Sequence, residues 1–243
     1  MSLYGKVAVV TGGSRGIGRA IAMALAGRGA RVAICHYADP EADRTLAALK
    51  AVSDGMAVDA DVSDEAQVKA LFDTVNDKLG AVDILVNNAG ILHESPLAET
   101  EAEAFDRVIA VNLRGTFLAS REFVRRGSAG RIINIASDLG LLGREHMAAY
   151  TASKGAIISL TRTLARELAP DVLVNAIAPG SIETDMTSPA SMSREQIAKD
   201  LATPLARFGQ PEEIAAMAVF LAGPDSGFIT GQCFGVNGGS VML

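Results

Sequence analysis

The sequence predicts an α/β protein with a single-domain, doubly wound Rossmann-type fold, in which helices cover both faces of a seven-stranded parallel sheet. Short, β-branched apolar runs alternate with longer amphipathic segments through the 243 residues. Continuous apolar strands separated by helices are typical of a parallel sheet buried on both faces. A glycine-rich turn follows the first apolar run. No linker, internal repeat or low-complexity tract divides the chain, so residues 1–243 are interpreted as one domain.

Hydrophobic periodicity places the individual elements. The expected strands cover residues 7–10, 31–35, 56–58, 82–86, 131–135, 172–177 and 233–236. The expected helices cover residues 20–28, 40–52, 64–79, 101–126, 148–168 and 211–221. Ser63 is expected to cap the helix that begins at residue 64, because a Ser hydroxyl accepts a hydrogen bond from a free N–H of the first turn.

One long irregular stretch, residues 181–205, lies between the expected sixth strand and the last helix. A connection of this length above the carboxyl edge of a sheet is a candidate substrate lid. Within it, Ser193 and Gln196 have the spacing of a capping box, which predicts a short helix.

Composition excludes several classes of function. The chain has 22 Lys and Arg against 28 Asp and Glu, a net charge of -6, whereas nucleic acid and anionic membranes attract a basic surface. An anionic cofactor remains possible, because backbone amides at a helix N-terminus bind phosphate without net positive charge. The first strand begins close to the N-terminus and no apolar segment could span a bilayer, so we expect a cytoplasmic protein. Cys35 and Cys233 are expected to be reduced, and the three His have no metal-ligand spacing, so no metal is expected.

The glycine-rich turn runs from Thr11 to Gly18, between the first strand and the first helix. Gly12, Gly16 and Gly18 stand where a sharp turn, a close approach to a pyrophosphate and helix-on-strand packing each need glycine. The spacing is GxxxGxG rather than GxGxxG, and an ordinary tight turn is the alternative interpretation. The position favours a dinucleotide site, with three further expected contacts: Ser14, Arg15 and Ile17.

The choice of cofactor depends on the end of the second strand, where an acidic residue would bind the ribose 2′-hydroxyl of NAD. His36 and Tyr37 occupy that position. Arg15 could reach a 2′-phosphate with its guanidinium, although it could also be a solvated surface charge. Asp39, an acidic residue nearby, argues in the opposite direction, for NAD(H). The pattern favours NADP(H) and leaves NAD(H) open.

Tyr150 and Lys154 are four residues apart in an expected helix, so they share a face. A phenol with a pKa of ~10 exchanges protons poorly near neutral pH. A Lys ammonium at ~4 Å and an effective dielectric of ~20 would favour the phenolate by about 4 kcal/mol, roughly three pKa units. Ser137 follows the fifth strand, where its hydroxyl could hold a carbonyl oxygen. A Tyr-x-x-x-Lys pair alone is usually structural, but the three residues together favour acid–base catalysis.

These residues resemble the short-chain dehydrogenase/reductase family from about Lys6 to the C-terminus. The matching features are residues 11–18, Asp61-Val62, residues 87–90, Asn112, Ser137 with Tyr150 and Lys154, and Pro179-Gly180 before Thr184. The resemblance implies that Tyr150 donates the proton in reduction and accepts it in oxidation. Lys154 would also hydrogen-bond the nicotinamide ribose, Ser137 would orient the substrate oxygen, and Asn112 would hold a water behind Lys154.

The resemblance also implies the cofactor contacts. Asp61 is similar to the residue that contacts the adenine amino group, with Val62 supplying backbone. Asn88, with Ala89 and Gly90, would line the cofactor site. Ile182 and Thr184 would touch the carboxamide end, and Pro179 and Gly180 would also contact the cofactor. Members of the family are usually dimers or tetramers, with the helices near residues 101–126 and 148–168 at one interface, which implies a homo-oligomer.

Residues 179–187 and the ending 236–239 look most like 3-oxoacyl-[acyl-carrier-protein] reductases. Two departures leave a carrier protein uncertain: the segment 112–130 is about a turn shorter, and Asp171 stands where a basic residue is frequent. Free ketones, acyl-CoA and sugars are therefore alternative substrates. Among the residues that could make the pocket selective, His146 is the favoured substrate contact; the others are His93, Glu94, Asp138, Leu139 and Leu141.

Three functions are compatible with these residues. The leading hypothesis is an NADPH-dependent reductase of a ketone, which includes 3-oxoacyl thioesters. The second is an NAD-dependent dehydrogenase of a sugar, polyol or other secondary alcohol, which would use the same site. The third is a non-catalytic dinucleotide-binding protein. It is disfavoured because a protein that only binds need not keep Tyr150, Lys154, Ser137 and Asn112 together.

Overall fold

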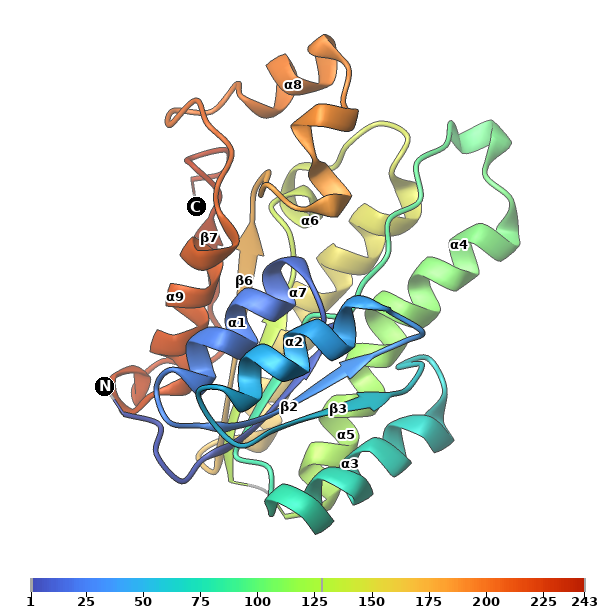
Figure 1. Cartoon of the computed structure of the whole chain (residues 1–243). Coiled ribbons are helices and arrows are strands. Elements are labelled where there is room, and N and C mark those ends of the chain that lie inside the picture. The colour runs from blue at the N-terminus through green and yellow to red at the C-terminus, as the bar shows by residue number, and fades with distance from the viewer. Residues whose placement is uncertain (1, 128, 243) are drawn as a thin grey trace.

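A computed structural model describes residues 2–127 and 129–242 of the chain. Seven parallel strands form one sheet in the order β3-β2-β1-β4-β5-β6-β7, twisted through the centre of the molecule (Figure 1). The strands are β1 Val7–Thr11, β2 Arg31–His36, β3 Gly55–Asp59, β4 Ile84–Asn87, β5 Gly130–Ile135, β6 Val172–Pro179 and β7 Cys233–Val236. The order reverses between β1 and β4, which is where a doubly wound sheet opens its ligand crevice. The predicted fold class is confirmed.

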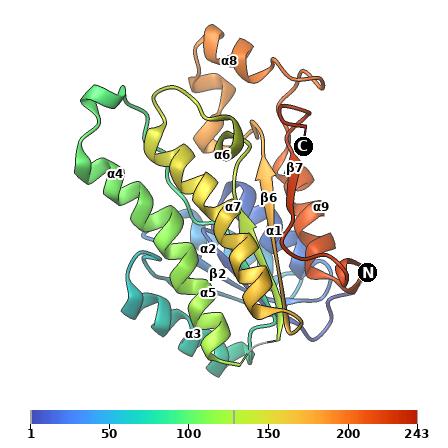
Figure 2. The same ribbon diagram turned by 180° about the vertical axis from the view of Figure 1, so that it is seen from behind.

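Helices lie on both faces of the sheet (Figures 1 and 2). The α-helices are α1 Gly16–Ala26, α2 Glu41–Lys50, α3 Glu65–Leu79, α4 Ala102–Ile109, α5 Gly115–Arg125, α6 Leu139–Leu142, α7 Ala148–Leu168, α8 Arg194–Asp200 and α9 Pro211–Ala222. Helices α1, α2 and α9 pack on one face, and α3, α5 and α7 on the other. Within the described residues, no helix combines the length and apolar character needed to cross a membrane.

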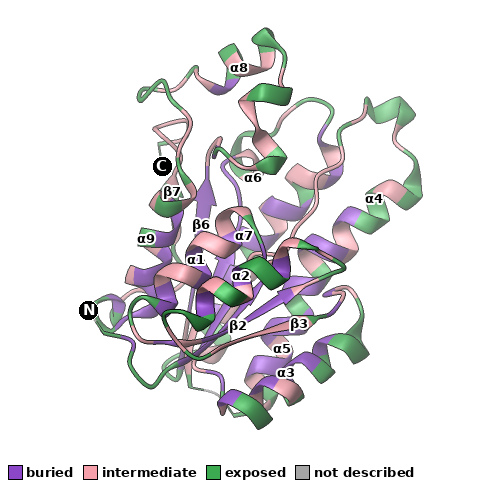
Figure 3. Ribbon diagram, viewed as in Figure 1, coloured by how far each residue is buried: buried purple, intermediate pink, exposed green. Residues whose placement is uncertain are grey.

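The core follows from the alternation of side chains along each strand. On β1, Ala8 and Val10 join the cluster that contains Leu25 of α1. Val7 and Val9 face the opposite way, into the cluster that contains Phe72 of α3. Both faces of the strand are therefore buried, and the central strands are purple along their length in Figure 3.

The single helix expected over residues 101–126 is wrong in one respect. Helices α4 and α5 are joined by a π-helical turn, Ala110–Arg114, within one continuous helical run. A π-turn inserts one extra residue per turn and is frequent at functional sites. It shifts the helical phase around Asn112, which is fully buried. Sequence periodicity could not predict this, because the apolar pattern on either side remains helical.

The start of α1 and the cap of α3 also differ from the expectations. Helix α1 begins at Gly16 rather than residue 20, directly after the phosphate turn. The cap of α3 is Asp64 and not Ser63: the Asp64 carboxylate accepts from the Gln67 N–H. The Ser63 hydroxyl instead donates to Asp61 over 2.7 Å.

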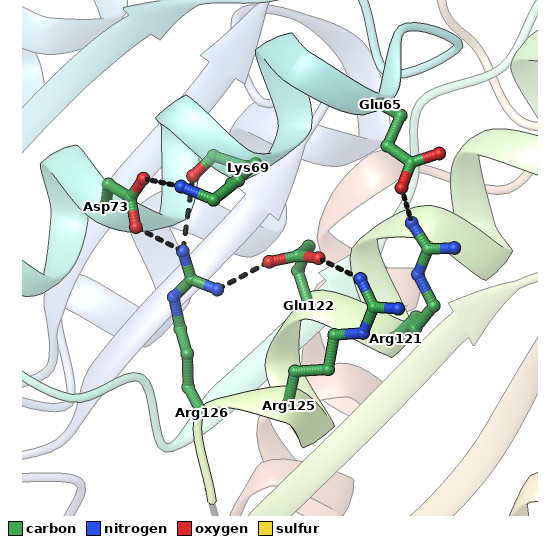
Figure 4. A network of polar contacts seen from close by, with 7 residues as sticks. All are labelled: Glu65, Lys69, Asp73, Arg121, Glu122, Arg125 and Arg126. Carbon is green, nitrogen blue, oxygen red and sulfur yellow. Dashed lines mark hydrogen bonds and ion pairs between the residues drawn. The ribbon is translucent and has the colours of Figure 1, made fainter.

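A network of charged side chains joins α3 to α5 (Figure 4). Arg126 of the α5 C-terminus pairs with buried Glu122 and with Asp73 of α3, each at 2.5 Å. Arg121 pairs with Glu65 at 2.5 Å, and Arg125 also reaches Glu122. The basic side chains at the end of α5 are therefore occupied by carboxylates of the same chain.

The irregular stretch 181–205 lies over the carboxyl edge of the sheet, with α8 at its outer end (Figure 1). The capping box of α8 is confirmed, since Ser193 and Gln196 exchange side-chain and backbone hydrogen bonds. Asp200 at the end of α8 pairs with Arg144 at 2.5 Å, and Lys199 pairs with Glu145. These contacts tie the stretch to the segment before α7.

Candidate active site

The carboxyl ends of β1, β4, β5 and β6 meet around the predicted site residues. A cavity of about 800 Å³ opens there. Ser137, Asp138, Tyr150, Gly180 and Ile182 line it from the sheet side. Its apolar side chains come from the α6 region and the irregular stretch: Leu139, Leu142, Met147, Met186, Met192 and Leu205. The cavity therefore places the polar residues of the sheet edge beside apolar side chains of the α6 region and of residues 181–205.

The phosphate turn packs too tightly for any residue but glycine at two positions. A Cβ on Gly18 would lie 2.1 Å from the Gly12 carbonyl oxygen, and a Cβ on Gly12 would lie 2.9 Å from the Cα of Ala89. Gly12 also has a φ of +62°, which favours glycine. No side chain caps the start of α1, so its first backbone amides remain available to a pyrophosphate. Partly buried Ile17 packs against the core beneath the turn.

Ser14 and Arg15 both contact Asp39, beyond the end of β2. The Ser14 hydroxyl donates to the Asp39 carboxylate over 2.7 Å, and Arg15 lies 3.4 Å from it. Burial acts to raise the pKa of Asp39, but hydrogen bonds from Ser14 and the Glu41 N–H and the charge of Arg15 hold it below its usual value. Arg15, expected to be free for a 2′-phosphate, also lies 3.8 Å from Asp185, although its side chain remains 62% exposed.

His36 and Tyr37 lie at the end of β2, as the sequence predicts. Within the described residues, the buried Nδ1 of His36 has no hydrogen-bond partner. Tyr37 is 62% exposed. An unpartnered polar atom beside an exposed aromatic ring is compatible with a nucleotide edge at this position.

Asp61 already makes several hydrogen bonds at the proposed adenine position. One carboxylate oxygen accepts from the N–H and the hydroxyl of Ser63. The other pairs with Arg107 of α4 at 3.0 Å. Burial acts to raise the pKa of Asp61, and these hydrogen bonds and the Arg107 charge lower it below its usual value. Val62 is buried against α5, where a Cβ on Gly115 would lie 2.8 Å from it.

Asn88 and Thr11 join the turn after β4 to the phosphate turn. The Asn88 amide donates to the carbonyls of Thr11 and Gly12 over 3.0 and 2.9 Å. The Thr11 hydroxyl accepts from the N–H groups of Asn88 and Ala89. This arrangement explains why the two turns stay in contact, and Thr11 is a structural residue whose function the glycine pattern did not reveal.

The Asn112 side chain hydrogen-bonds the backbone of Ile91, in the turn that follows β4. Its Oδ1 accepts from the Ile91 N–H over 2.8 Å, and its Nδ2 donates to the Ile91 carbonyl and to Ser153. A Cβ on Gly90 would lie 3.4 Å from Asn112 Oδ1 and 3.6 Å from Lys154 Nζ. The π-turn, the turn after β4 and α7 therefore meet at one point.

Tyr150, Lys154 and Ser137 come together at the carboxyl edge. Lys154 Nζ donates to the Ile135 carbonyl over 2.8 Å and lies 5.7 Å from the centre of the Tyr150 ring. The Ser137 Oγ accepts from the Leu139 N–H over 3.1 Å. Lys154 and Ser137 are buried and Tyr150 is half-buried. Ser137 and Tyr150 thus line the cavity, with buried Lys154 next to the Tyr150 ring.

The expected acidity of Tyr150 is wrong for this structure. Burial raises the pKa of the phenol to about 12, opposed by a hydrogen bond with Ser137 and reinforced by the charge of Asp138. Burial also lowers the pKa of Lys154 to about 8. Desolvation disfavours both charged forms and here outweighs the attraction between them. Tyr150 therefore holds its proton at neutral pH, the state required of a proton donor.

The segment after β6 lies against both halves of the site. The Pro179 carbonyl accepts from the Asp138 N–H over 3.0 Å. A Cβ on Gly180 would lie 2.8 Å from the Cα of Asn237. Ile182 is buried in the core. Thr184 contacts the phosphate turn, since a Cβ on Gly16 would lie 3.5 Å from it.

Some of the residues expected to contact the substrate line the cavity and others do not. His146, the favoured substrate contact, is exposed with a φ of +64° and is not among the described residues that line the cavity. Glu94 and Leu139 do line it. Sequence reasoning missed Ser240, whose hydroxyl donates to Asp138 over 2.5 Å. Across the described residues, no group of three His, Cys, Asp or Glu side chains could hold a metal ion.

Replacing Lys154 by Ala should weaken NADPH binding about tenfold or more and also lower turnover. The variant removes a charge-assisted hydrogen-bond donor, worth about 1.5–3 kcal/mol, from the wall of the site. Lys154→Met keeps most of the buried volume and separates loss of charge from loss of packing. Cofactor titration and steady-state kinetics check both variants. Unchanged affinity in the two would exclude Lys154 from the cofactor site.

The chain is similar to proteins of one family over its full length. A family model described as "Enoyl-(Acyl carrier protein) reductase" matches residues 12–241. A 3-oxoacyl-[acyl-carrier-protein] reductase of Synechocystis sp. is 42% identical, and the match covers 100% of this chain and 99% of that protein.

Solved structures agree with this similarity. A blue fluorescent protein from a metagenomic library, in complex with NADPH, is 39% identical with a TM-score of 0.93, and both chains are covered completely. A short-chain dehydrogenase from Burkholderia cenocepacia, in complex with NADP, is 36% identical with a TM-score of 0.93, over 98% of this chain and 99% of that one. The matched fold and the full-length identity together place this chain in the short-chain dehydrogenase/reductase family, whose members are NAD(P)-dependent oxidoreductases.

Proposed function

We propose that the chain is an NADPH-dependent carbonyl reductase that acts on 3-oxoacyl thioesters. The observation that carries the proposal is half-buried Tyr150 beside Ser137 on the wall of a cavity to which α6 and residues 181–205 contribute apolar side chains. Relatives of the chain include a protein named 3-oxoacyl-[acyl-carrier-protein] reductase, and structures of relatives contain NADPH or NADP.

The proposed chemistry assigns one task to each side chain. Bound NADPH supplies the hydride. The Ser137 oxygen accepts from the Leu139 N–H; its own proton, which the Asp138 carboxylate accepts in this structure, would turn to the substrate carbonyl oxygen. Tyr150 donates its proton to that oxygen as it becomes an alkoxide. Lys154 is held by the Ile135 carbonyl and keeps further N–H donors for the nicotinamide ribose. Asn112 would keep its predicted place behind Lys154.

The proposed cofactor contacts follow the phosphate turn and its neighbours. Gly12, Gly16 and Gly18 would admit the pyrophosphate, and His36 and Tyr37 would meet the adenosine end. The Asp39 carboxylate accepts from Ser14 and the Glu41 N–H and its charge is offset by Arg15 at 3.4 Å, which weakens its repulsion of a 2′-phosphate. This internal pairing supports NADPH over NADH.

The proposed substrate fits the chamber beyond Tyr150. Leu142, Met186 and Met192 offer a flexible apolar lining for an acyl chain. We also propose that residues 181–205 act as a lid on this chamber. Of the cations around it, Arg144, Lys199 and Arg207 are paired within the chain, whereas exposed Arg194 of α8 is in no ion pair among the described residues, so a carrier protein stays an alternative to a free or CoA-linked thioester.

We propose further that the protein is a homo-oligomer, a dimer or tetramer, working in the cytoplasm. Phe105 of α4 and Phe117 of α5 are 38% and 43% exposed, and exposed aromatic side chains are typical of protein interfaces. Cys35 and Cys233 are both free thiols, as is usual in a reducing compartment. Sedimentation of the purified protein tests the oligomer.

NADPH should support reduction with a kcat/KM at least about tenfold above NADH, equivalent to about 1.4 kcal/mol. Both cofactors are compared in steady-state assays against 3-oxoacyl thioesters, diketones and sugars. Arg15→Ala should reduce the preference for NADPH over NADH, because the exposed guanidinium of Arg15 is the cation of the phosphate turn. A preference for NADH with sugar or polyol oxidation would replace the proposal by the dehydrogenase alternative. Tight cofactor binding with no turnover would indicate a binding protein.

A further inference from the structure

Helix α8 lies over the carboxyl edge of the sheet without an apolar anchor (Figure 1). It has seven residues, and Asp200 is the only one of them that is buried. A helix this short is not stable without tertiary contacts. Among the described residues, the hydrogen bonds and ion pairs that join residues 188–202 to the chain outside the stretch 181–205 are Asp200 with Arg144 and Lys199 with Glu145. The position of α8 therefore depends on charge rather than on apolar packing.

The two ion pairs join two neighbouring residues of α8 to two neighbouring residues of the segment before α7. Asp200 lies 2.5 Å from Arg144, and the two side chains are 3% and 16% exposed. Lys199 pairs with Glu145 nearer to solvent. All four residues line the cavity, and we call them the clasp. The clasp thus connects two parts of the cavity lining that are far apart in the sequence.

The half of the clasp before α7 is held by its backbone. Gly143 and His146, with φ of +72° and +64°, turn the chain on either side of Arg144 and Glu145. A positive φ is uncommon for a residue other than glycine and persists where the surroundings hold it. Here the His146 carbonyl accepts from the Ser95 N–H over 2.8 Å. His146, which the sequence suggested as a substrate contact, therefore shapes this half of the clasp.

The half of the clasp on α8 belongs to a segment with a fixed base. The Gly209 N–H donates to the Ser181 carbonyl and the Glu183 N–H donates to the Gly209 carbonyl, each over 2.9 Å. The Leu205 N–H donates to the Gly238 carbonyl over 3.1 Å. Residues 184–204 thus leave and rejoin the body of the protein at anchored points. An ion pair suits a reversible contact between such a segment and its neighbour, because water solvates both charges once they separate.

We propose that the clasp determines the length of acyl chain that the cavity accepts. The inference rests on the proposed function. Leu142 and Met192, two apolar residues of the cavity lining, lie on the two segments that the clasp joins. While both ion pairs hold, these segments stay at a fixed separation, and a short acyl chain is bound between them. A longer chain reaches past them only when α8 moves away. The clasp therefore favours short acyl chains over long ones.

The first test needs no turnover. Hydrogen exchange of the α8 amides is compared by mass spectrometry in the wild type, Arg144→Gln and Asp200→Asn. Arg144→Gln leaves the sequence of α8 unchanged, and Asp200→Asn removes an anion from a helix C-terminus, where it is unfavourable. Neither change weakens the helix itself, so faster exchange reports the lost ion pair. Both variants should exchange at least about tenfold faster in α8, a change of about 1.4 kcal/mol.

Arg121→Gln is the matched control, because it breaks an equally short ion pair, with Glu65 between α5 and α3. Its α8 amides should exchange as in the wild type. Unchanged exchange of α8 in both Arg144→Gln and Asp200→Asn would overturn the inference, whether or not the enzyme reduces thioesters.

The second test measures chain-length preference with a four-carbon and a twelve-carbon 3-oxoacyl-CoA thioester. The ratio of kcat/KM for the long over the short substrate should rise in Arg144→Gln and Asp200→Asn, by up to about the factor found in exchange, because that factor is the gain in the open population. Faster exchange with an unchanged ratio overturns the inference and leaves the proposed function standing. A wild type that reduces no carbonyl removes the proposed function instead, and faster exchange of α8 then still supports the clasp.

Discussion

Replacing Tyr150 by Phe should lower the turnover of carbonyl reduction about 10³-fold, within the range that a positioned general acid contributes. The substitution removes one oxygen and keeps the ring, so the packing of α7 stays intact. Lys154, Asn112 and the phosphate turn keep their hydrogen bonds, and NADPH affinity should therefore change less than about threefold. Single-turnover rates and fluorescence titration of the cofactor measure the two quantities separately.

Tyr4→Phe is the matched control, because Tyr4 is 88% exposed and does not line the cavity. Its rate should equal that of the wild type. A Tyr150→Phe enzyme that reduces substrate at the wild-type rate would exclude the proton donor on which the mechanism depends. A large loss of NADPH affinity in that variant would instead indicate that Tyr150 holds the cofactor rather than the proton.

Replacing Gly18 by Ala should destabilise the protein by about 3 kcal/mol and weaken NADPH binding more than tenfold. The new Cβ would lie 2.1 Å from the Gly12 carbonyl oxygen and 2.5 Å from the Asn88 amide. Backbone cannot yield at that distance without moving α1 away from the phosphate turn, and overpacking of this kind costs about 1–3 kcal/mol or more. Urea unfolding and cofactor titration give the two effects.

Gly27→Ala provides the control on the same helix. Gly27 has a φ of -63°, and its Cβ would lie 3.3 Å from the nearest atom, the Met23 carbonyl oxygen. Stability should change by less than about 1 kcal/mol, with no effect on NADPH. Equal effects of the two substitutions would show that the phosphate turn tolerates side chains, against the close-packed turn described above.

The fold was predictable because its signals are local. Apolar runs such as those of β1 and β2 indicate buried parallel strands, and the glycines between β1 and α1 indicate a close turn. The π-turn at residues 110–114 was not predictable, since it changes the phase of a helix without breaking its apolar pattern. The cap of α3 also moved by one residue: Asp64 and Ser63 are both good caps, but the Ser63 hydroxyl donates to Asp61 and accepts from Arg107 of α4.

The features of the site can likewise be separated into those that local sequence predicts and those that it does not. Ser137, Tyr150 and Lys154 could be found from their order and spacing. The bond between Asp138 and Ser240 joins residues 102 positions apart, and no local pattern indicates it. The pKa of Tyr150 was expected to fall because the spacing places Lys154 nearby. The burial that raises it instead depends on the whole wall of the cavity. Local geometry is readable from sequence, whereas desolvation is a property of the assembled fold.

Transfer of deuterium from the cofactor tests the central claim most directly. NADPH deuterated at the transferring position of C4 is mixed with the enzyme and a short 3-oxoacyl thioester, and the product is analysed by mass spectrometry. A 3-hydroxyacyl thioester with one deuterium on the carbinol carbon is the expected product, with almost none formed by Tyr150→Phe. Unlabelled product, or cofactor that remains reduced with every carbonyl of the panel, would contradict the account.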